Sequence, residues 1–219
     1  MDHVLYLDIE TIPSQSPELA ERIRAGIKPP GSIKKPESIA TWMEENADAA
    51  VAEALAKTSF DPATGHICTI GYAIDNGDPV ALHAATVDGE AAILEGFFAA
   101  IRPYHRYVIV GHNVGGFDLR FILCRAVVLG ITVPPALPRD PKPWDKGVFD
   151  TMTAWAGARG SIGMDRLCEA LGLPGKDGFD GSMVAAAWAA GEHDRIATYC
   201  ADDVAKTRAV HRRFVAVGW

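Results

Sequence analysis

The first apolar run of the chain, at positions 4–11, is interrupted by two carboxylates and predicts a β-strand. It reads Val-Leu-Tyr-Leu-Asp-Ile-Glu-Thr. Because successive side chains of a strand point to opposite faces, Asp8 and Glu10 are expected to share one face. Leu7 and Ile9 then point to the other. Two carboxylates this close repel each other unless a cation such as a divalent metal ion lies between them, although an edge strand that turns both to water would show the same pattern.

Four more apolar runs predict the other strands of the sheet. They lie at 66–74, 79–86, 107–110 and 146–150. Residues 75–78, Asp-Asn-Gly-Asp, are typical of a hairpin turn, so the two runs that they join are expected to be antiparallel. Later in the chain the strands alternate with helical patterns. The sequence therefore predicts an α/β fold with a mixed sheet of about five strands flanked by helices.

Apolar residues recur at intervals of three and four between and after these runs, which predicts amphipathic helices. The predicted helices cover 17–24, 36–59, 90–101, 117–129, 164–171, 182–190 and 196–217, the last with Asp194 as its N-cap. Gly130, Gly172 and Gly191 follow three of them, where a helix commonly ends. We expect a single domain over residues 1–219, in which residues 13–60 form a partly helical insertion after the first strand.

The composition is that of an ordinary globular protein. The hydrophobic share of 48% and the charged share of 22% over 219 residues exclude disorder of the whole chain and allow a sizeable core. We find no apolar run long enough to span a membrane and no basic leader segment, so we expect a cytoplasmic protein without a membrane partner. The four cysteines lack C-x-x-C spacing and lie in apolar surroundings, which favours buried thiols over disulfides or a zinc site.

The net charge limits the kind of nucleic-acid contact that the chain can make. A formal charge of −7 argues against broad, non-specific adhesion, since that affinity comes from Lys and Arg at phosphates. It does not exclude a nucleic-acid enzyme, because metal ions held by acidic residues supply positive charge locally. Any nucleic-acid contact is expected to be short.

Two later stretches also place carboxylates at chemically useful positions. Asp118 ends the stretch 111–118, where a buried strand gives way to a helix, and loops at strand ends are where α/β folds place their sites. An Asp in a first helical turn also stabilises the helix dipole without any further role. Tyr199 and Asp203 are four residues apart and share one face of the last helix, which would equally suit an ordinary solvated face. Asp202 points away from Asp203 and is expected to face solvent.

Together the three stretches resemble the three motifs of the DEDD superfamily of 3′–5′ exonucleases, in order and spacing. The matching residues are Asp8 and Glu10, then Asn113, Phe117 and Asp118, then Tyr199 and Asp203. Thr198 stands where the histidine subclass carries its histidine, so the resemblance is to the tyrosine subclass, DEDDy. The stretches 171–176 and 199–204 look most similar to stand-alone exonucleases related to the proofreading domain of family B DNA polymerases.

This resemblance implies a ribonuclease H-like fold and a metal-dependent hydrolase. The expected reaction is 3′–5′ removal of nucleoside 5′-monophosphates from single-stranded 3′ ends, with DNA favoured over RNA. Two Mg²⁺ or Mn²⁺ ions suit the hard carboxylate oxygens and the charge that develops at phosphorus. No protein partner is indicated.

The hypothesis gives each site residue a role. Asp8 contacts both ions, Glu10 and Asp203 complete the ion that carries the attacking water, and Asp118 holds the second ion largely through waters. Tyr199 orients the attacking water, since a phenol with a pKa near 10 is a poor base at neutral pH.

Five residues are candidates for substrate contacts. The backbone of Ile9 and Thr11 is expected to meet the terminal 3′ hydroxyl. Phe117 either stacks on a base or belongs to the core, and Asn113 either contacts the penultimate nucleotide or caps its loop. Lys176 either reaches a phosphate or is a solvated lysine.

Two neighbouring polar residues are given structural roles. His112 is expected to be a loop histidine rather than a ligand. Asp150 is either an indirect support of the site or the N-cap of the following helix, and the cap is favoured.

Two rival functions remain open. The first is an RNA-processing exonuclease similar to ribonuclease D, a family that usually adds helical RNA-binding domains after the core, whereas this chain ends at Trp219. The second is a catalytically silent nucleic-acid-binding module. That module would be expected to have lost part of the site, but all four carboxylates and the tyrosine are present.

Overall fold

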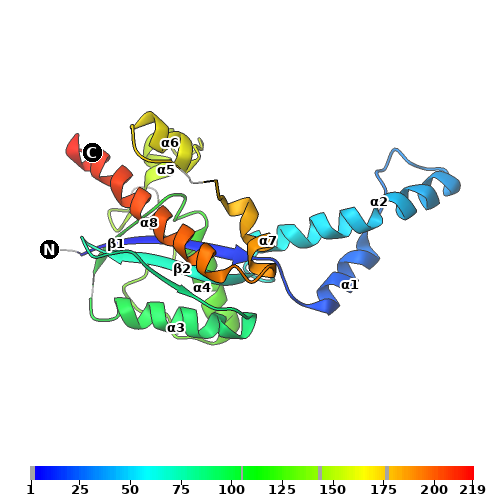
Figure 1. Cartoon of the computed structure of the whole chain (residues 1–219), viewed down its shortest axis with the longest axis horizontal. Coiled ribbons are helices and arrows are strands. Elements are labelled where there is room, and N and C mark those ends of the chain that lie inside the picture. The colour runs from blue at the N-terminus through cyan, green and yellow to red at the C-terminus, as the bar shows by residue number, and fades with distance from the viewer. Residues whose placement is uncertain (1–2, 105, 143–144, 176–177) are drawn as a thin grey trace.

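A five-stranded mixed sheet forms the centre of the molecule in a computed structural model that describes residues 3–104, 106–142, 145–175 and 178–219 (Figure 1). The strands are β1 (His3–Ile12), β2 (His66–Ile74), β3 (Val80–His83), β4 (Tyr107–Gly111) and β5 (Val148–Asp150). Their order is β3-β2-β1-β4-β5. The hairpin partners β2 and β3 are antiparallel, as is β2 to β1, whereas β4 and β5 run parallel to β1. The predicted mixed sheet is confirmed.

Helices connect and cover these strands. They are α1 (Pro17–Gly26), α2 (Pro36–Ala56), α3 (Glu90–Ile101), α4 (Asp118–Leu129), α5 (Thr151–Ala156), α6 (Met164–Ala170), α7 (Val184–Ala189) and α8 (His193–Ala216), with the 3₁₀ turns η1 (Lys57–Phe60), η2 (Val87–Gly89) and η3 (Gly181–Met183). All seven predicted helices are found. Gly130 ends α4 in a left-handed conformation with φ +70°, as its predicted C-terminal position requires.

Two local predictions about the helices were wrong or incomplete. The N-cap of α8 is Glu192, not Asp194, which lies inside the first turn of the helix. A carboxylate there still faces the positive end of the helix dipole, so Asp194 is favourable at either position. The short helix α5 was expected only through its N-cap, Asp150, and its range was not predicted, because six residues are too few to show a helical period.

The two faces of β1 pack against different helices. Leu5, Leu7 and Ile9 belong to the largest hydrophobic cluster, which they share with α3 and α4. Tyr6 lies on the opposite face and packs with Val204 of α8. Figure 1 shows α8 and α3 on opposite sides of the sheet. A polar side chain on the Tyr6 face of β1 therefore points toward α8.

A buried ion pair ties the helical layer to the sheet. The guanidinium of Arg125 donates from Nε and from a terminal nitrogen to Glu90, at 2.8 and 2.7 Å, and both residues are almost fully buried. Glu90 also accepts the backbone N–H of Ile67 on β2 at 2.8 Å. Burial alone would raise the pKa of Glu90, but hydrogen bonds from His66, Arg125 and Ile67 hold it below the ordinary value. The pair thus joins α3 and α4 to β2.

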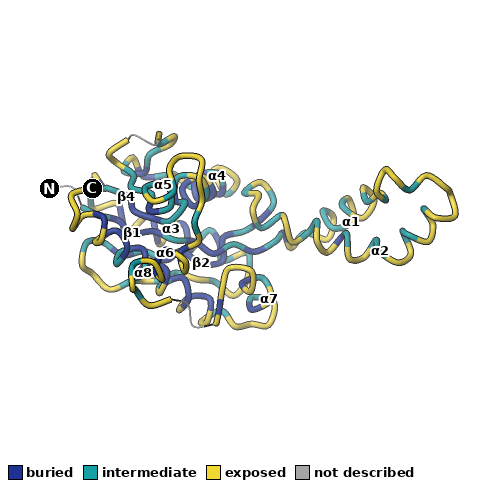
Figure 2. The backbone as a smooth tube through the Cα atoms, turned by 90° about the horizontal axis from the view of Figure 1, so that it is seen from above, coloured by how far each residue is buried: buried dark blue, intermediate teal, exposed yellow. Residues whose placement is uncertain are grey.

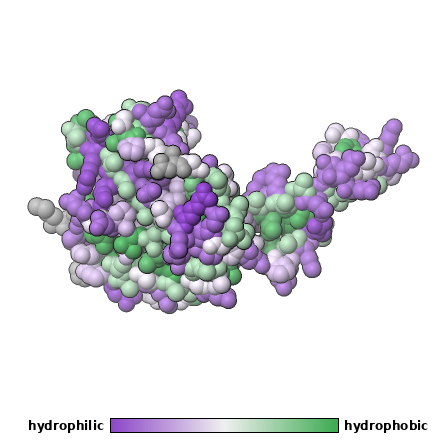
Figure 3. Space-filling view, in the orientation of Figure 1, coloured by the Kyte–Doolittle hydropathy of each residue, from purple (hydrophilic) through white to green (hydrophobic). Residues whose placement is uncertain are grey.

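Residues 13–60, here called the arm, project from this body as a helical hairpin of α1 and α2 (Figure 2). Both helices lie wholly within the described residues, yet α1 has no buried residue and α2 has one, Val51. Hydrophobic colour gathers on the arm near its junction with the body, and the rest of its surface is mostly hydrophilic (Figure 3). The arm therefore adds little to the hydrophobic core.

Two expectations from composition can be compared with the described residues. None of their helices is both long and apolar enough to cross a membrane. The four cysteines are free thiols, and Cys68, Cys168 and Cys200 are buried as predicted, whereas Cys124 is half-buried on α4.

Candidate active site

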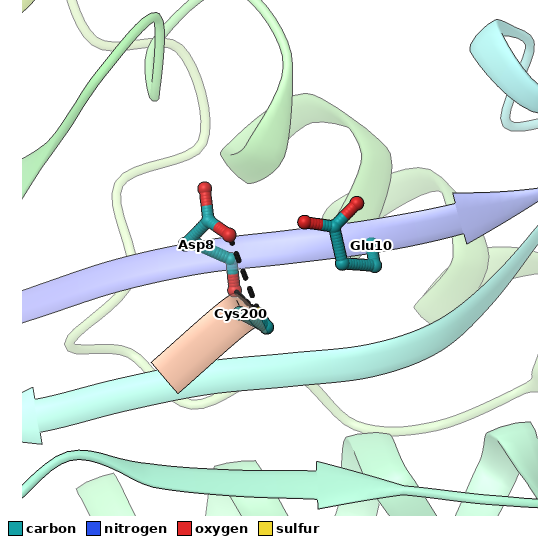
Figure 4. Close-up of side chains that lie close together, drawn as sticks. All are labelled: Asp8, Glu10 and Cys200. Atoms are coloured by element: carbon teal, nitrogen blue, oxygen red, sulfur yellow. Dashed lines mark hydrogen bonds between the residues drawn. The ribbon is translucent and has the colours of Figure 1, made fainter. Parts of the chain in front are cut away.

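Asp8 and Glu10 project from the same face of β1, and the thiol of Cys200 on α8 reaches them (Figure 4). One ligand atom of each of the three residues lies within 4.8 Å of those of the other two. The thiol donates a hydrogen bond to the Asp8 carboxylate at 3.3 Å. On β2, Gly71 pairs with Asp8, and a Cβ at Gly71 would lie 2.8 Å from the Cys200 sulfur. Only a glycine at this position lets α8 approach the sheet so closely.

Glu10 lies where the pairing of β1 with β2 becomes irregular. The register shifts between Glu10 and Thr11, as in a β-bulge. Such a shift redirects side chains and often occurs beside functional sites. Glu10 is 8% exposed, and its backbone carbonyl accepts a hydrogen bond from the buried thiol of Cys68 at 3.4 Å. The carboxylate of Glu10 is thereby held near that of Asp8 without full exposure to water.

Asp118 enters the site from the first turn of α4. The strand β4 pairs with β1 only as far as Tyr6, so the backbone of β1 beyond that point has no strand on this side. The carboxylate of Asp118 accepts the N–H of Ile9 at 3.0 Å and takes the place of the missing strand. Burial raises the pKa of Asp118 to about 7, against the opposing effect of the hydrogen bonds from its own backbone and from Ile9.

The loop that carries Asp118 is held by Asp150. The Asp150 carboxylate accepts the backbone N–H groups of Asn113 at 3.0 Å and Gly115 at 3.3 Å. It also caps α5 by accepting the N–H groups of Met152 and Thr153, so its predicted role as an N-cap is confirmed. One carboxylate thus fixes both the loop before α4 and the helix after β5.

The backbone of Asn113 forms the turn of the same loop. It is left-handed, with φ +66°, and its carbonyl accepts from the N–H groups of Gly116 and Phe117. A Cβ at Gly116 would lie 2.5 Å from the Asn113 side-chain oxygen. This tight turn aims the start of α4 at β1. Next to it, His112 bonds to the Thr151 hydroxyl at 2.9 Å and the carbonyl of Ile162 at 2.8 Å, as expected of a loop histidine.

The last helix contributes Tyr199 and Asp203, one turn apart on a face that is largely buried. Burial raises the pKa of Tyr199 far above that of a free phenol. The charges of Asp203 and Glu10 and a hydrogen bond to Asp203 raise it further. Tyr199 is therefore a neutral hydrogen-bond donor. Lys206, one turn further along α8, donates to Asp203 at 3.1 Å in a mostly buried ion pair. The next residue, Asp202, is exposed as predicted.

These four carboxylates, Asp8, Glu10, Asp118 and Asp203, are called the carboxylate cluster below. Burial and the charges of Glu10, Asp118 and Asp203 raise the pKa of Asp8 well above its ordinary value, opposed by the hydrogen bond from Cys200. Among the described residues, the group of three or more potential ligands within 4.8 Å contains Asp8 and Glu10 but neither Asp118 nor Asp203. The hard oxygen donors and the mutual repulsion that raises the pKa of Asp8 fit a divalent cation such as Mg²⁺ or Mn²⁺.

The residues proposed to contact substrate have mixed outcomes. The N–H of Ile9 is already bonded to Asp118, and the hydroxyl of Thr11 donates to the carbonyl of Ser59 at 2.8 Å. Phe117 packs on the main hydrophobic cluster but is only partly buried. Lys176 lies outside the described residues.

A cleft of about 350 Å³ lies beside the loop before α4. It is lined by Asn113, Gly115 and Gly116 on one side and by residues of the 141–160 segment on the other. Asn113 thus shapes its loop and also lines a surface cleft. Its contact with the penultimate nucleotide stays a prediction.

Sequence reasoning missed Cys200 and Lys206 as members of the site. Both lie on the turns of α8 that carry Tyr199 and Asp203, and the helical period places residue 206 on the same side as Asp203. That period was the available signal for Lys206. Nothing in the sequence indicated that Gly71 would admit the Cys200 thiol to Asp8.

Comparison with known proteins adds to this geometry. Residues 64–218, well over half of the chain, match the profile of a family described as "Predicted 3'-5' exonuclease related to the exonuclease domain of PolB". The matched region contains Asp118, Tyr199 and Asp203 but begins after the strand that carries Asp8 and Glu10. No curated protein sequence gives a significant match.

The fold also resembles a solved structure, that of the family B DNA polymerase from the hyperthermophilic archaeon Pyrobaculum calidifontis. The two superpose with a TM-score of 0.60 and 19% sequence identity over 98% of this chain. The chain spans about a quarter of that polymerase, 25% of its length. At this identity the likeness shows the fold alone, and the predicted ribonuclease H-like α/β fold is confirmed.

Proposed function

Because the chain belongs to the family of predicted 3′–5′ exonucleases related to the exonuclease domain of PolB, we propose that it is a metal-dependent 3′–5′ exonuclease. It acts on single-stranded nucleic acid, DNA in preference to RNA, and releases nucleoside 5′-monophosphates. The observation that carries this proposal is the convergence of four carboxylates from β1, α4 and α8, of which Asp8 responds to the charges of the other three.

The carboxylate cluster would hold two divalent ions. When bound, such ions lower the pKa of a coordinated water and stabilise the departing 3′ oxygen. We assign Asp8 to both ions, since it is the carboxylate whose pKa is raised by all the others. Glu10 and Asp203 would complete one site and Asp118 the other. Replacing Asp8 by Ala should therefore weaken Mn²⁺ binding more than replacing Glu10 by Ala, and calorimetric titration that gave the reverse order would refute this assignment.

Tyr199 acts as a positioning donor in this scheme. Its raised pKa keeps the phenol protonated at neutral pH, so it cannot take a proton from water. Its hydroxyl instead donates a hydrogen bond, in the present structure to Asp203. From there it can orient a water held at the same carboxylate. This role supports the proposal that the chain belongs to the tyrosine subclass, DEDDy.

The remaining assignments concern the whole chain. Residues 1–219 form one exonuclease domain, and the arm is an insertion between β1 and β2. The cleft beside Asn113 and the partly exposed ring of Phe117 are offered as substrate contacts, because both lie next to Asp118. Since the N–H of Ile9 is bonded to Asp118, a contact from this strand to the 3′ hydroxyl would require another backbone atom.

A single-stranded DNA labelled at its 5′ end tests this function. With Mn²⁺ present, stepwise shortening from the 3′ end is expected, and none with chelator. An RNA strand of the same sequence should be shortened more slowly. Faster shortening of the RNA would favour an RNA-processing enzyme, and binding of either strand without products would favour a silent binding module.

A further inference from the structure

Phe60, the last residue of the arm, exposes an aromatic ring next to the candidate active site. It is 72% exposed, more than any other aromatic residue in the described part of the chain. Its ring centroid lies 6.3 Å from that of Phe117, at an interplanar angle of 59°. Phe117 directly precedes Asp118 of the carboxylate cluster. An exposed ring therefore stands beside a partly buried one at the edge of the site.

The segment that carries Phe60 is fixed to the end of β1. The hydroxyl of Thr11 donates to the carbonyl of Ser59 at 2.8 Å, and the N–H of Ser14 donates to the hydroxyl of Thr58 at 2.9 Å. Thr11 follows Glu10 directly. These two hydrogen bonds therefore attach η1 to the end of β1 and to the residues that follow it, starting directly after the second carboxylate of the cluster.

The start of β2 closes the other side of η1. A Cβ at Gly65 would lie 2.4 Å from the carbonyl oxygen of Thr58 and 3.2 Å from that of Ile12. Only a glycine permits this approach of three backbone segments. Phe60 thus belongs to a fixed turn rather than to a free loop, although the helices of the arm are mostly exposed.

An exposed phenylalanine on a fixed turn has no role in the hydrophobic core. Fixing it leaves a large apolar face in water, which a ligand with a flat apolar face would cover. Nucleobases have such faces, and aromatic stacking accepts every base. The chain carries a net charge of −7, so contacts to bases suit it better than an extended set of phosphate contacts.

We propose that Phe60 stacks on a nucleobase close to the scissile phosphate, with Phe117 as the neighbouring wall of the same subsite. This inference rests on the proposed exonuclease function and assigns to the arm a contact with substrate. Inside a duplex a base is stacked on both faces, and only the terminal pair leaves one face of each base free for Phe60. The subsite therefore favours strands whose last bases are unpaired.

Steady-state cleavage of single-stranded DNA by four proteins tests this subsite. They are the wild type, Phe60→Ala, Phe60→Leu and Phe60→Trp. Stacking predicts that Phe60→Ala raises KM by roughly fivefold to a hundredfold with kcat little changed. Phe60→Trp should keep a KM near that of the wild type, whereas Phe60→Leu, which keeps apolar bulk without a ring, should not. A wild-type KM for Phe60→Leu would overturn the proposal. Trp219→Ala is the matched control, because Trp219 is also an exposed aromatic residue, 69% exposed, and is not part of the proposed subsite. Its KM should stay at the wild-type value.

Substrates that lack one base identify the partner of Phe60. Each of the last three nucleotides is made abasic in turn. At one position the wild type should show the rise in KM that Phe60→Ala shows with the intact strand, and Phe60→Ala should show no further rise there. The proposal would be overturned if, at each of the three abasic positions, Phe60→Ala raised KM by the same factor as it does with the intact strand.

The same strands separate this inference from the proposed function. If the wild type cleaves nothing, the exonuclease function fails, and anisotropy of the labelled strands still reports whether Phe60 and a base interact. If the wild type cleaves and Phe60→Ala has the same KM as the wild type, only the stacking subsite fails. Thermal unfolding of each variant confirms that the fold is retained.

Discussion

The body and the arm of this chain differ in what holds them together. In the body, β1 is paired on both sides and each of its faces is covered by helices. In the arm, α1 and α2 rest mainly on each other, and Val51 is the one buried residue of the two helices. The body has the buried setting that shifts the pKa values of Asp8 and Asp118. The arm has no comparable cluster among its described residues and meets the site at its root.

This difference teaches where catalysis and recognition can be placed. Carboxylates that repel one another must be held by a rigid surrounding structure, and only the sheet with its helices provides that. A segment with little buried surface can change conformation easily. The arm's attachment point at η1, however, is held by hydrogen bonds to the end of the first strand. The contrast predicts that substitutions in the body change chemistry and global stability, whereas those in the arm change substrate contact or local order.

The largest effect is expected for Asp203→Asn. Loss of this carboxylate should lower the rate of cleavage at least about a thousandfold, since residues that act together in one site are not replaceable by the rest. Asp202→Asn is the matched control, because Asp202 is the exposed neighbour on the same helix. It should retain wild-type cleavage. Equal loss in both variants would mean that the charge of α8, not the cluster, matters.

Next in size is the loss of the buried ion pair of the body. Glu90→Ala leaves the guanidinium of Arg125, 4% exposed on its side chain, without its partner carboxylate. Breaking such a pair costs about 3–5 kcal/mol of the free energy of unfolding. Urea denaturation should show this loss. Arg24→Ala breaks the exposed pair with Asp48 on the arm and should change stability by less than about 1 kcal/mol.

The pH dependence of the metal-free body should show the raised pKa of Asp118. In the folded state this pKa is about 7, compared with an ordinary value of 3.8. The folded protein then binds more protons than the unfolded one between these values, so stability falls as pH rises from about 4 to about 7. The loss amounts to at most about 4 kcal/mol over this window. Asp118→Asn can still accept the N–H of Ile9 and should make the decline shallower in thermal melts, while an unchanged slope would contradict the assignment.

The smallest effect is expected in the arm itself. Val51→Ala removes the one buried side chain of α2 and should lower global stability by about 1 kcal/mol or less, since little surrounds it. Hydrogen exchange should instead quicken locally in α1 and α2, with that of β1 and β2 unchanged. Global destabilisation like that of Glu90→Ala would show that the arm is an integral part of the core.

The sequence predicted both regions, but through different signals. Local periodicity was enough for α1 and α2, whose residues contact mainly each other, and for β1 and β2. The grouping of Asp8, Glu10, Asp118, Tyr199 and Asp203 came from the resemblance of motifs, and their catalytic roles stay predictions. Contacts between distant segments gave no such signal. The thiol of Cys200 meets Asp8 across 192 positions, and its approach depends on the missing side chain of Gly71.

Phe60 illustrates the same limit. In the sequence it follows the helix predicted at 36–59, in a segment that the motifs do not need, so its ring has no evident role. Its place beside Phe117 follows from hydrogen bonds of η1 to Thr11 and Ser14 and from the close approach at Gly65. None of these contacts is encoded by a period of two or of 3.6 residues.

The central claim, that the body is a metal-dependent exonuclease, is tested most directly by the identity of the first product. A single-stranded DNA is prepared with a radioactive phosphate on the 5′ side of its 3′-terminal nucleotide. With Mn²⁺, the wild type should release this label as a nucleoside 5′-monophosphate before any other product forms, and Asp8→Asn should release none. A wild type that releases the label only within longer oligonucleotides, or releases it equally with chelator, would contradict the account.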